Sequence, residues 1–451
     1  MTDAPREPQR RPVKRTWSGL YVPDWYEESP EADVSSLSQE DFETQLDGLE
    51  TFRTNPDVRC VWEFDPSRGP LPGLSFPPGA TCIAGSDAWI VCPYVPGKII
   101  IHSPIALSAG RFSFGITHGV LFDSNLYDLI VRFVELPEQL SAQSTKGIRN
   151  LIEALVTRRY DYQLMPYVLE ALAKNPCERG YEYAFRGTRA ILKLHTMDKE
   201  YFRATGTVRS DPDRLRDYES DFGTTDLDLI AQAQLEPYQG FSKTPLEVSL
   251  TLLAMIEMVL IQRVSKPSSG FDAKFAAFDE FLFGELGLIK GSFRNMGILC
   301  FSGKLDRWIR VQANSNTEKA LALLSNCAWD LYLGNIYQQI LAESPETQPT
   351  LCHFCTRERE LAYLLSVSQL RALKVLKKGG PIPFFEVDFS FYRDAIGDGW
   401  ERSLLLADRR MEGFLEQRQT GSLQTVDKDR IPAMLGRSIQ KFREAIGRKD
   451  S

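Results

Sequence analysis

The stretch GVLFDSNLYDLIVRF, residues 119–133, most restricts the folds open to this chain, because it changes structural type at one acidic residue. Its opening GVLF is a short continuous apolar run, which is typical of a strand buried on both faces of a parallel sheet. Apolar residues then recur at helical spacing, at Leu126, Leu129, Ile130 and Phe133. We predict a strand, a tight turn and a helix with Asn125 as its N-cap.

Asp123 lies at the carboxyl end of the predicted strand, where open α/β sheets place their ligand sites. A simpler interpretation is that its carboxylate only accepts hydrogen bonds from the turn that follows. On this segment alone the simpler interpretation is the better one. The rest of the chain has to supply further residues before Asp123 can be assigned a chemical role.

Two later segments place a carboxylate on an apolar helix. PYVLEAL puts Glu170 between Leu169 and Ala171, and SNCAWDLYL puts Asp330 between two large apolar residues. Asn326 precedes Asp330 by one helical turn and therefore lies on the same helix face. A carboxylate at an apolar surface is costly unless it is paired, protonated or bound to a metal ion.

A second strand-turn-helix pattern follows in LCHFCTRERELAYLL. The apolar run ends at Thr356, which we predict to be the N-cap of a helix with Glu358 and Glu360 in its first turn. If this unit lies beside the first one, four carboxylates converge. We therefore expect a site made of Asp123, Glu170, Asp330 and Glu358.

Convergent carboxylates suit Mg²⁺ or Mn²⁺, which take oxygen ligands and keep several water molecules while substrate phosphate supplies further oxygens. The cation relieves the repulsion between the acids, lowers the pKa of a bound water and stabilises charge that develops on a phosphodiester. Aspartate and glutamate without a histidine partner favour these ions over Zn²⁺.

These segments resemble the motifs of PIN-like nuclease domains. VLFDSNLYDLI is similar to the first motif, PYVLEAL to the helix that carries a glutamate, NCAWDLYL to the helix with the third acid, and FCTREREL to the last strand-to-helix motif. The resemblance covers residues 116–176 and 320–370. It implies an α/β fold with a PIN-like core and a mostly parallel sheet, in which Asp123, Glu170, Asp330 and Glu358 bind the metal. The last acid departs from the family, which more often has aspartate there, and Glu360 is an alternative.

Residues that support the acids are expected beside them. By the resemblance, Asn125 shapes the turn, while Asn326, Thr356 and Glu360 hold the metal ligands in place. Positive charge near the second and fourth motifs would neutralise nucleic-acid phosphates, and solvated surface positions are an equal alternative. The candidate phosphate contacts are Arg158, Arg159, Arg357 and Lys374.

Other patterns exclude competing functions. The net charge of −7 argues against a general polyanion binder, although the site of a nuclease is itself acidic. CHFC, residues 352–355, has the spacing of zinc ligands, but the chain has no second pair of suitable spacing, so a buried strand is the better interpretation. A phosphate-binding GxxxxGK[ST] loop is missing from the sequence. The eight scattered cysteines and an N-terminus without a signal-peptide pattern predict a cytoplasmic protein with reduced thiols.

The chain of 451 residues is long enough for two or three packed units. We expect a disordered basic tail at residues 1–20, a β-containing N-terminal section at 21–115, the PIN-like domain at 116–375 and a helical region at 376–451. A large helical insertion is predicted at about residues 177–300. Its most apolar stretch, residues 248–262, contains Glu257 and falls short of a membrane span, so it is predicted to be a buried helix.

The expected function is metal-dependent hydrolysis of phosphodiester bonds, an endonuclease reaction with RNA preferred to DNA as the substrate. The alternative is a non-catalytic protein of the same fold that docks a protein partner through its helical insertion. Neither interpretation involves a membrane.

Overall fold

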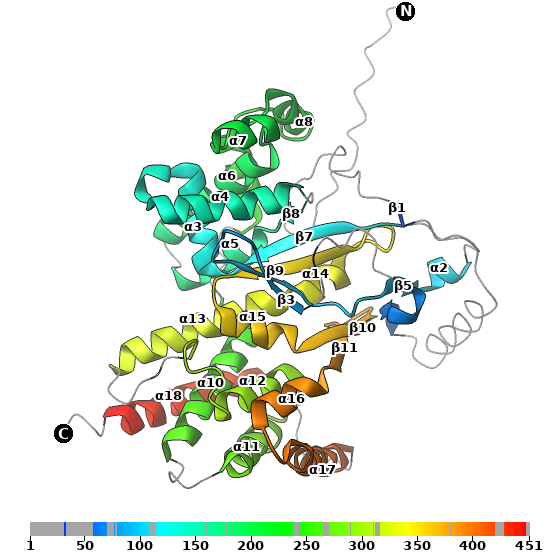
Figure 1. Cartoon of the computed structure of the whole chain (residues 1–451), viewed down its shortest axis with the longest axis vertical. Coiled ribbons are helices and arrows are strands. Elements are labelled where there is room, and N and C mark those ends of the chain that lie inside the picture. Colours follow the sequence, from blue (N-terminus) through cyan, green and yellow to red (C-terminus); the bar gives the residue numbers. More distant parts are fainter. Residues whose placement is uncertain are drawn as a thin grey trace, which may run out of the picture.

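The computed structural model is an α/β protein in which helices cover both faces of a five-stranded sheet (Figure 1). A second sheet has four strands, and β1 (Glu31–Ala32) pairs with β6 (Phe114–Gly115) as a separate two-stranded unit. The basic tail predicted for residues 1–20 lies outside the described residues. The described residues are 31–32, 57–69, 76, 79–108, 114–157, 160–175, 178–238, 243–264, 270–288, 290–309, 311, 316–378, 380–419 and 428–447.

The five-stranded sheet has the order β3-β4-β9-β7-β8. β7 is parallel to both of its neighbours, β9 and β8, whereas β4 is antiparallel to β9 and to β3. The prediction of a mostly parallel sheet is therefore confirmed only in part: two of the four pairings are parallel, and the β3–β4 hairpin from the N-terminal section adds the two antiparallel ones. The strands are β3 (Gly79–Cys82), β4 (Trp89–Cys92), β7 (Thr117–Phe122), β8 (Asp161–Tyr162) and β9 (Thr350–Thr356).

Successive residues of β7 point to opposite faces of this sheet, and each face is covered by its own hydrophobic core. Val120 and Phe122 belong to one core, while Leu121 between them belongs to the other. The first core packs helices α3 to α9 on one face, above the sheet in Figure 1. These helices are α3 (Ser124–Glu135), α4 (Ala142–Thr157), α5 (Met165–Lys174), α6 (Glu178–His195), α7 (Lys199–Thr205), α8 (Pro212–Phe222) and α9 (Leu227–Leu235).

The second core lies on the other face and is the larger of the two. It contains the apolar helix predicted at residues 248–262, which is buried as expected and forms α10. The helices of this side are α10 (Leu246–Val264), α11 (Phe271–Glu280), α12 (Gly291–Phe301), α13 (Thr317–Asn335), α14 (Tyr337–Glu343), α15 (Arg359–Ser366), α16 (Phe389–Ile396), α17 (Trp400–Gln419) and α18 (Ile431–Gly447).

The helical insertion predicted at about residues 177–300 is confirmed as helical, from α6 to α12. It is not a single inserted body, however. Helices α6 to α9 pack in the first core, whereas α10 to α12 pack in the second, on the opposite face of the sheet. The insertion therefore contributes to both layers that enclose the sheet.

The four-stranded sheet has the order β11-β10-β2-β5 and is antiparallel throughout. Two of its strands, β2 and β5, belong to the N-terminal section that was predicted to contain β-structure. The region predicted as helical from residue 376 was wrong at its start, because β11 returns along β10 and apolar Leu373 and Val375 of β10 fill the core beneath. The strands are β2 (Val58–Asp65), β5 (Lys98–His102), β10 (Ser368–Leu376) and β11 (Ile382–Val387).

Candidate functional site

Asp123 follows the last residue of β7 and is fully buried. It is the N-cap of α3, where its Oδ1 accepts a hydrogen bond from the backbone N–H of Leu126 at 2.6 Å. The other oxygen, Oδ2, accepts from the hydroxyl of Thr356 and from the backbone N–H of Arg357 at 3.2 Å. The prediction that Asn125 caps this helix was wrong, because Asp123 already satisfies the free N–H and leaves Asn125 exposed in the first turn.

Glu170 lies on α5 and points toward the start of α3, since its Oε2 accepts a hydrogen bond from Ser124 Oγ at 2.5 Å. Its Oε1 accepts from Lys174 Nζ, also at 2.5 Å, one turn further along the same helix. Lys174 Nζ donates at 2.9 Å to Asn326 Oδ1 on α13, so Asn326 contacts the lysine that pairs with Glu170. Ser124 and Lys174 were missed in the sequence, although the spacing of four residues from Glu170 could have indicated the lysine.

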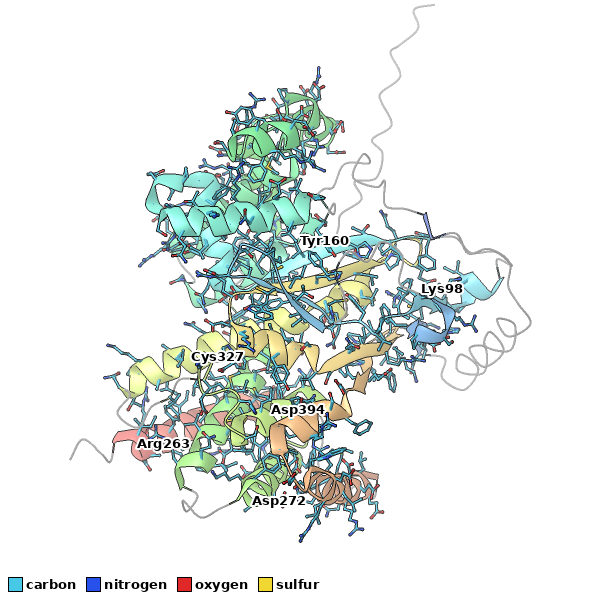
Figure 2. All side chains as sticks on the ribbon, viewed as in Figure 1. Lys98, Tyr160, Arg263, Asp272, Cys327 and Asp394 are labelled. Atoms are coloured by element: carbon cyan, nitrogen blue, oxygen red, sulfur yellow. The ribbon has the colours of Figure 1, made fainter. Side chains whose placement is uncertain are left out.

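Asp330 lies on α13 and is only 6% exposed. Burial is the main reason why its pKa is raised well above the ordinary value of 3.8, and the carboxylates of Asp123, Glu170 and Glu358 raise it further. Lys174 acts in the opposite direction. Figure 2 labels Cys327, which precedes Asp330 by three residues on the same helix. All four predicted acids therefore share one electrostatic environment, which we call the acid cluster.

The pKa of Asp123 is also raised, first because the group is buried, and in addition by the charge of Glu358. Its hydrogen bonds from Thr356, Leu126 and Arg357 lower it and so oppose the burial. Two carboxyl groups that resist ionisation at one place are typical of a functional site, where a cation or a proton completes the charge balance.

Glu358 and Thr356 occupy positions different from those predicted. Thr356 is the last residue of β9, and Glu358 stands at the N-cap position of α15 without a side-chain capping bond. The prediction of Thr356 as the N-cap was wrong because its hydroxyl serves Asp123 on the neighbouring strand. Glu358 donates its backbone N–H to the same hydroxyl at 2.9 Å. Thr356 thus connects two of the acids directly.

Glu360 has a different role from the one predicted. Its Oε2 accepts hydrogen bonds from the backbone N–H groups of Arg307 and Trp308, at 3.0 and 2.8 Å. The carboxylate therefore fastens the segment before α13 to α15. The carboxylate of Glu360 is thus bonded to the segment before α13, whereas Glu358 is the glutamate of this helix whose charge raises the pKa of both Asp123 and Asp330.

Two of the four predicted phosphate contacts lie in the described part of the chain. Arg158 and Arg159 lie outside the described residues. Arg357 adjoins the acid cluster through its backbone, and its guanidinium pairs with Asp87 at 3.2 Å. Lys374 lies on β10 of the other sheet, with its ammonium 5.9 Å from the centre of the Phe384 ring.

The cysteines of CHFC belong to strand β9, in agreement with the prediction. Cys352 and Cys355 are fully buried, and burial is the main reason why the pKa of each thiol is raised well above 9.0. A thiol with a raised pKa is a poor zinc ligand, because zinc binds the thiolate. Within the described part of the chain, no group of three or more His, Cys, Asp or Glu side chains is arranged to hold a metal ion, and this includes the acid cluster.

The raised pKa of Asp330 predicts how the unfolding free energy of the protein depends on pH. The pKa of Asp330 is higher in the folded than in the unfolded protein, so the protonated carboxyl group stabilises the folded state. This stabilisation is lost as the pH rises through the folded-state pKa. Asp330→Asn cannot ionise. In EDTA at pH 7 we expect it to be more stable than the wild type by about 0.5–2 kcal/mol in urea unfolding, with the difference shrinking toward pH 4.

The matched control is Asp394→Asn, at a surface position whose carboxylate is 64% exposed and paired only with its neighbour Arg393 at 3.6 Å among the described residues. It should change stability by no more than about 0.5 kcal/mol. An Asp330→Asn protein less stable than the wild type at pH 7 would show that the carboxylate is stabilised by its surroundings.

The comparisons with known proteins add no family assignment: no family model, curated protein or solved structure matches the chain. Among the helices of the described residues, none combines the length and the apolar character needed to cross a membrane.

Proposed function

We propose that the acid cluster binds Mg²⁺ or Mn²⁺ and that the protein hydrolyses phosphodiester bonds of nucleic acid, RNA in preference to DNA, as a PIN-like endonuclease. One observation carries the proposal. Carboxylates from four distant segments act on each other, and Asp123, Glu170 and Glu358 all raise the pKa of Asp330. A protein of ordinary stability seldom gathers like charges in its interior unless a ligand compensates them.

The chemistry of the donors suits a hard divalent ion, since every candidate ligand is a carboxylate oxygen. When bound, such an ion would supply a water of lowered pKa and a positive charge beside the scissile phosphate. Asp123, Glu170, Asp330 and Glu358 would hold it. In this role Asp123 would be held by its hydrogen bonds from Thr356 and Leu126.

The ion pair between Lys174 and Glu170 must open before Glu170 can bind a metal ion. The ammonium of Lys174 already neutralises Glu170, and its side chain is 31% exposed while that of Glu170 is 5% exposed. A divalent ion must therefore compete with Lys174 for Glu170, and the side chains must adjust, because the described residues contain no preformed group of three ligands. The exposed lysine can turn into solvent at little cost.

The second candidate is a non-catalytic interaction protein that docks a partner through the helical insertion. Two apolar side chains on insertion helices favour it, Tyr183 on α6 at 37% exposure and Leu229 on α9 at 53%. In this case Lys174 is the permanent counterion of the acid cluster, and no metal ion is needed.

Binding of Mn²⁺ distinguishes the two candidates. At a concentration a hundred times its Kd, Mn²⁺ should stabilise the wild type by about 2.7 kcal/mol in thermal unfolding, because it binds only the folded state. Asp330→Asn should lose most of this gain. Lys174→Met should bind Mn²⁺ several-fold more tightly than the wild type in calorimetry, because it removes the competing ammonium.

Under the second candidate the same proteins behave differently. Mn²⁺ leaves the unfolding temperature of the wild type unchanged. Lys174→Met is less stable, since it leaves buried Glu170 without its counterion, and Mn²⁺ does not restore the loss. That pair of results would refute a metal site.

A further inference from the structure

The ammonium of Lys174 lies at the boundary between the acid cluster and solvent. Lys174 is the last residue of α5, and its side chain is 31% exposed. Its Nζ donates to Oε1 of buried Glu170 at 2.5 Å and to Oδ1 of exposed Asn326 at 2.9 Å. Oxygens of this kind are the ligands that Mg²⁺ and Mn²⁺ prefer, so the ammonium occupies a position that suits a divalent ion.

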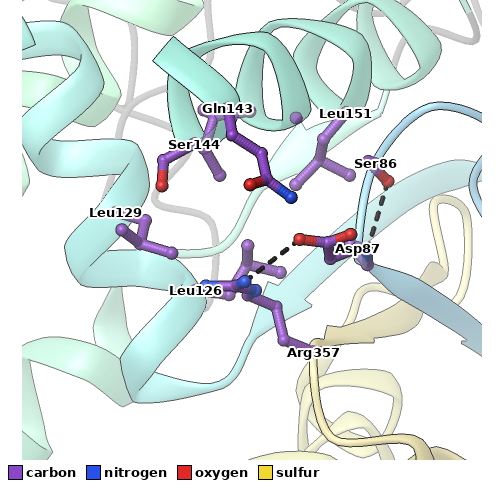
Figure 3. Close-up of a pocket in the computed structure, with 11 residues that line it drawn as sticks. Ser86, Asp87, Leu126, Leu129, Gln143, Ser144, Leu151 and Arg357 are labelled. Atoms are coloured by element: carbon purple, nitrogen blue, oxygen red, sulfur yellow. Dashed lines mark hydrogen bonds and ion pairs between the residues drawn. The ribbon is translucent and has the colours of Figure 1, made fainter. Parts of the chain in front are cut away.

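The charge of Lys174 also acts on the interior of the acid cluster. It lowers the pKa of Asp330, against the effects of burial and of three carboxylates. Arg357 donates its backbone N–H to Asp123, but Figure 3 shows its guanidinium directed at Asp87, at a distance of 3.2 Å. Lys174, rather than Arg357, therefore supplies the positive side-chain charge that balances the acids.

A divalent ion at this position displaces the ammonium, because two cations that share the same pair of oxygens repel each other. Both carboxylate oxygens of Glu170 already accept a hydrogen bond, Oε1 from Lys174 and Oε2 from Ser124. The hydroxyl of Ser124 can rotate toward another acceptor. The charge of Lys174, in contrast, needs either water or an anion, and a phosphate beside the metal ion is such an anion.

The side chain of Lys174 is suited to this movement. Lysine carries a compact ammonium with three N–H donors on a flexible stem, and it is a common phosphate ligand in proteins. In contacts between described residues, two of these donors are in use. The third can contact a phosphate from the solvent side before the bonds to Glu170 and Asn326 open.

We propose that Lys174 moves from Glu170 to a substrate phosphate when the metal ion binds, so that the metal ion and the phosphodiester of nucleic acid bind cooperatively. The inference rests on the proposed metal site and makes Lys174 a residue that contacts the substrate. Without nucleic acid Lys174 opposes the metal ion, whereas with nucleic acid it stabilises the complex of all three. Coupling between two ligands is reciprocal, so the metal ion strengthens nucleic acid binding by the same factor.

The test measures binding of Mn²⁺ without cleavage. Electron paramagnetic resonance quantifies free Mn²⁺ in titrations of the full chain, with and without a saturating octamer of 2′-O-methyl uridine joined by phosphorothioates, which resists hydrolysis. Mn²⁺ bound by the octamer alone is measured separately and subtracted. We expect the octamer to tighten Mn²⁺ binding to the wild type about twentyfold. Because direct contact between phosphate and ion contributes to this coupling, Lys174→Met should retain about two- to fourfold of it.

Three further variants separate the charge of the lysine from its packing. Lys174→Arg keeps a cation at the end of α5 and should keep most of the coupling. Lys378→Met removes an exposed lysine between β10 and β11 and should behave as the wild type. Circular dichroism checks that each variant is folded. If Lys174→Met is not, Lys174→Gln takes its place, since its amide can still donate to Glu170.

The inference and the proposed function fail in different ways. Equal coupling in the wild type and in Lys174→Met would overturn the inference, and so would a Mn²⁺ affinity of the wild type that the octamer leaves unchanged. Either result leaves the metal site intact, because Mn²⁺ still binds. Absence of Mn²⁺ binding, with and without the octamer, would refute the metal site and the inference together.

Discussion

Asp330→Asn is expected to reduce metal-dependent cleavage of single-stranded RNA by at least about a hundredfold. Asp330 is the acid on which the other three act, so its removal alters the whole set of candidate ligands. Loss of groups that merely support a metal ligand commonly costs ten- to a hundredfold, and a ligand itself should cost at least as much. The measurement is the cleavage rate of labelled RNA with Mn²⁺, Mg²⁺ or EDTA.

The stability of the same variant makes the result easy to interpret. Because Asp330→Asn relieves repulsion in the acid cluster, we expect it to be folded and more stable, so lost activity cannot be ascribed to unfolding. Asp394→Asn serves again as the control with unchanged rate. Equal cleavage by the wild type and Asp330→Asn would identify the activity as a contaminant and leave the interaction protein as the better proposal.

Asp279→Ala is expected to cost about 3 kcal/mol of unfolding free energy, the largest stability loss we predict. Asp279 on α11 is completely buried and binds Arg294 of α12 at 3.3 Å and Arg410 of α17 at 3.0 Å. Burial raises the pKa of Asp279, but unlike Asp330 this carboxylate is bonded to two arginines, which oppose the shift. Removing it leaves both guanidinium groups without their shared partner, and breaking a buried ion pair costs about 3–5 kcal/mol. We expect the lower end of this range because Arg294 keeps Asp408 at 3.7 Å.

Asp408→Ala is the matched control for this prediction. It removes a carboxylate from the same arginine, but the Asp408 side chain is 57% exposed, so the loss should be no more than about 1 kcal/mol. Urea unfolding at pH 7 measures both. If the two variants lose the same free energy, the buried position of Asp279 contributes nothing beyond a surface pair, and α17 is held by its apolar contacts alone.

Local sequence patterns were sufficient where the neighbours of a residue decide its structure. Apolar spacing predicted the strand and helix on either side of Asp123, and the helical region predicted at the C-terminal end contains α17 and α18. The N-caps were predicted incorrectly because they depend on contacts between segments that are distant in the sequence. Asn125 and Thr356 are good capping residues by type. Asp123, however, is the N-cap of α3, and the Thr356 hydroxyl donates its hydrogen bond to Asp123.

The candidate site could be predicted only in part. The four acids were named from the sequence because each lies at an apolar surface, where an ionised group requires a reason. Ser124, which donates to Glu170, could not be assigned, since serine is ordinary at a helix start, whereas Lys174 was missed although its spacing of four residues from Glu170 is typical of an ion pair. The Asp87 pair with Arg357 was equally hidden, because it joins a hairpin turn to a segment far along the chain.

The sequence by itself determined the strand and helix around Asp123, the buried helix α10 and which carboxylates stand on apolar faces, because these depend on residues within a few positions of each other. The tertiary structure decided everything that depends on pairing over long distances. Asp123 and Thr356 are 233 positions apart, and they meet only because β7 and β9 lie side by side in parallel. The same pairing, extended by the β3–β4 hairpin, brings Asp87 to Arg357. The sequence does not reveal these contacts because many pairings of buried strands satisfy the same apolar pattern, and packing selects one of them.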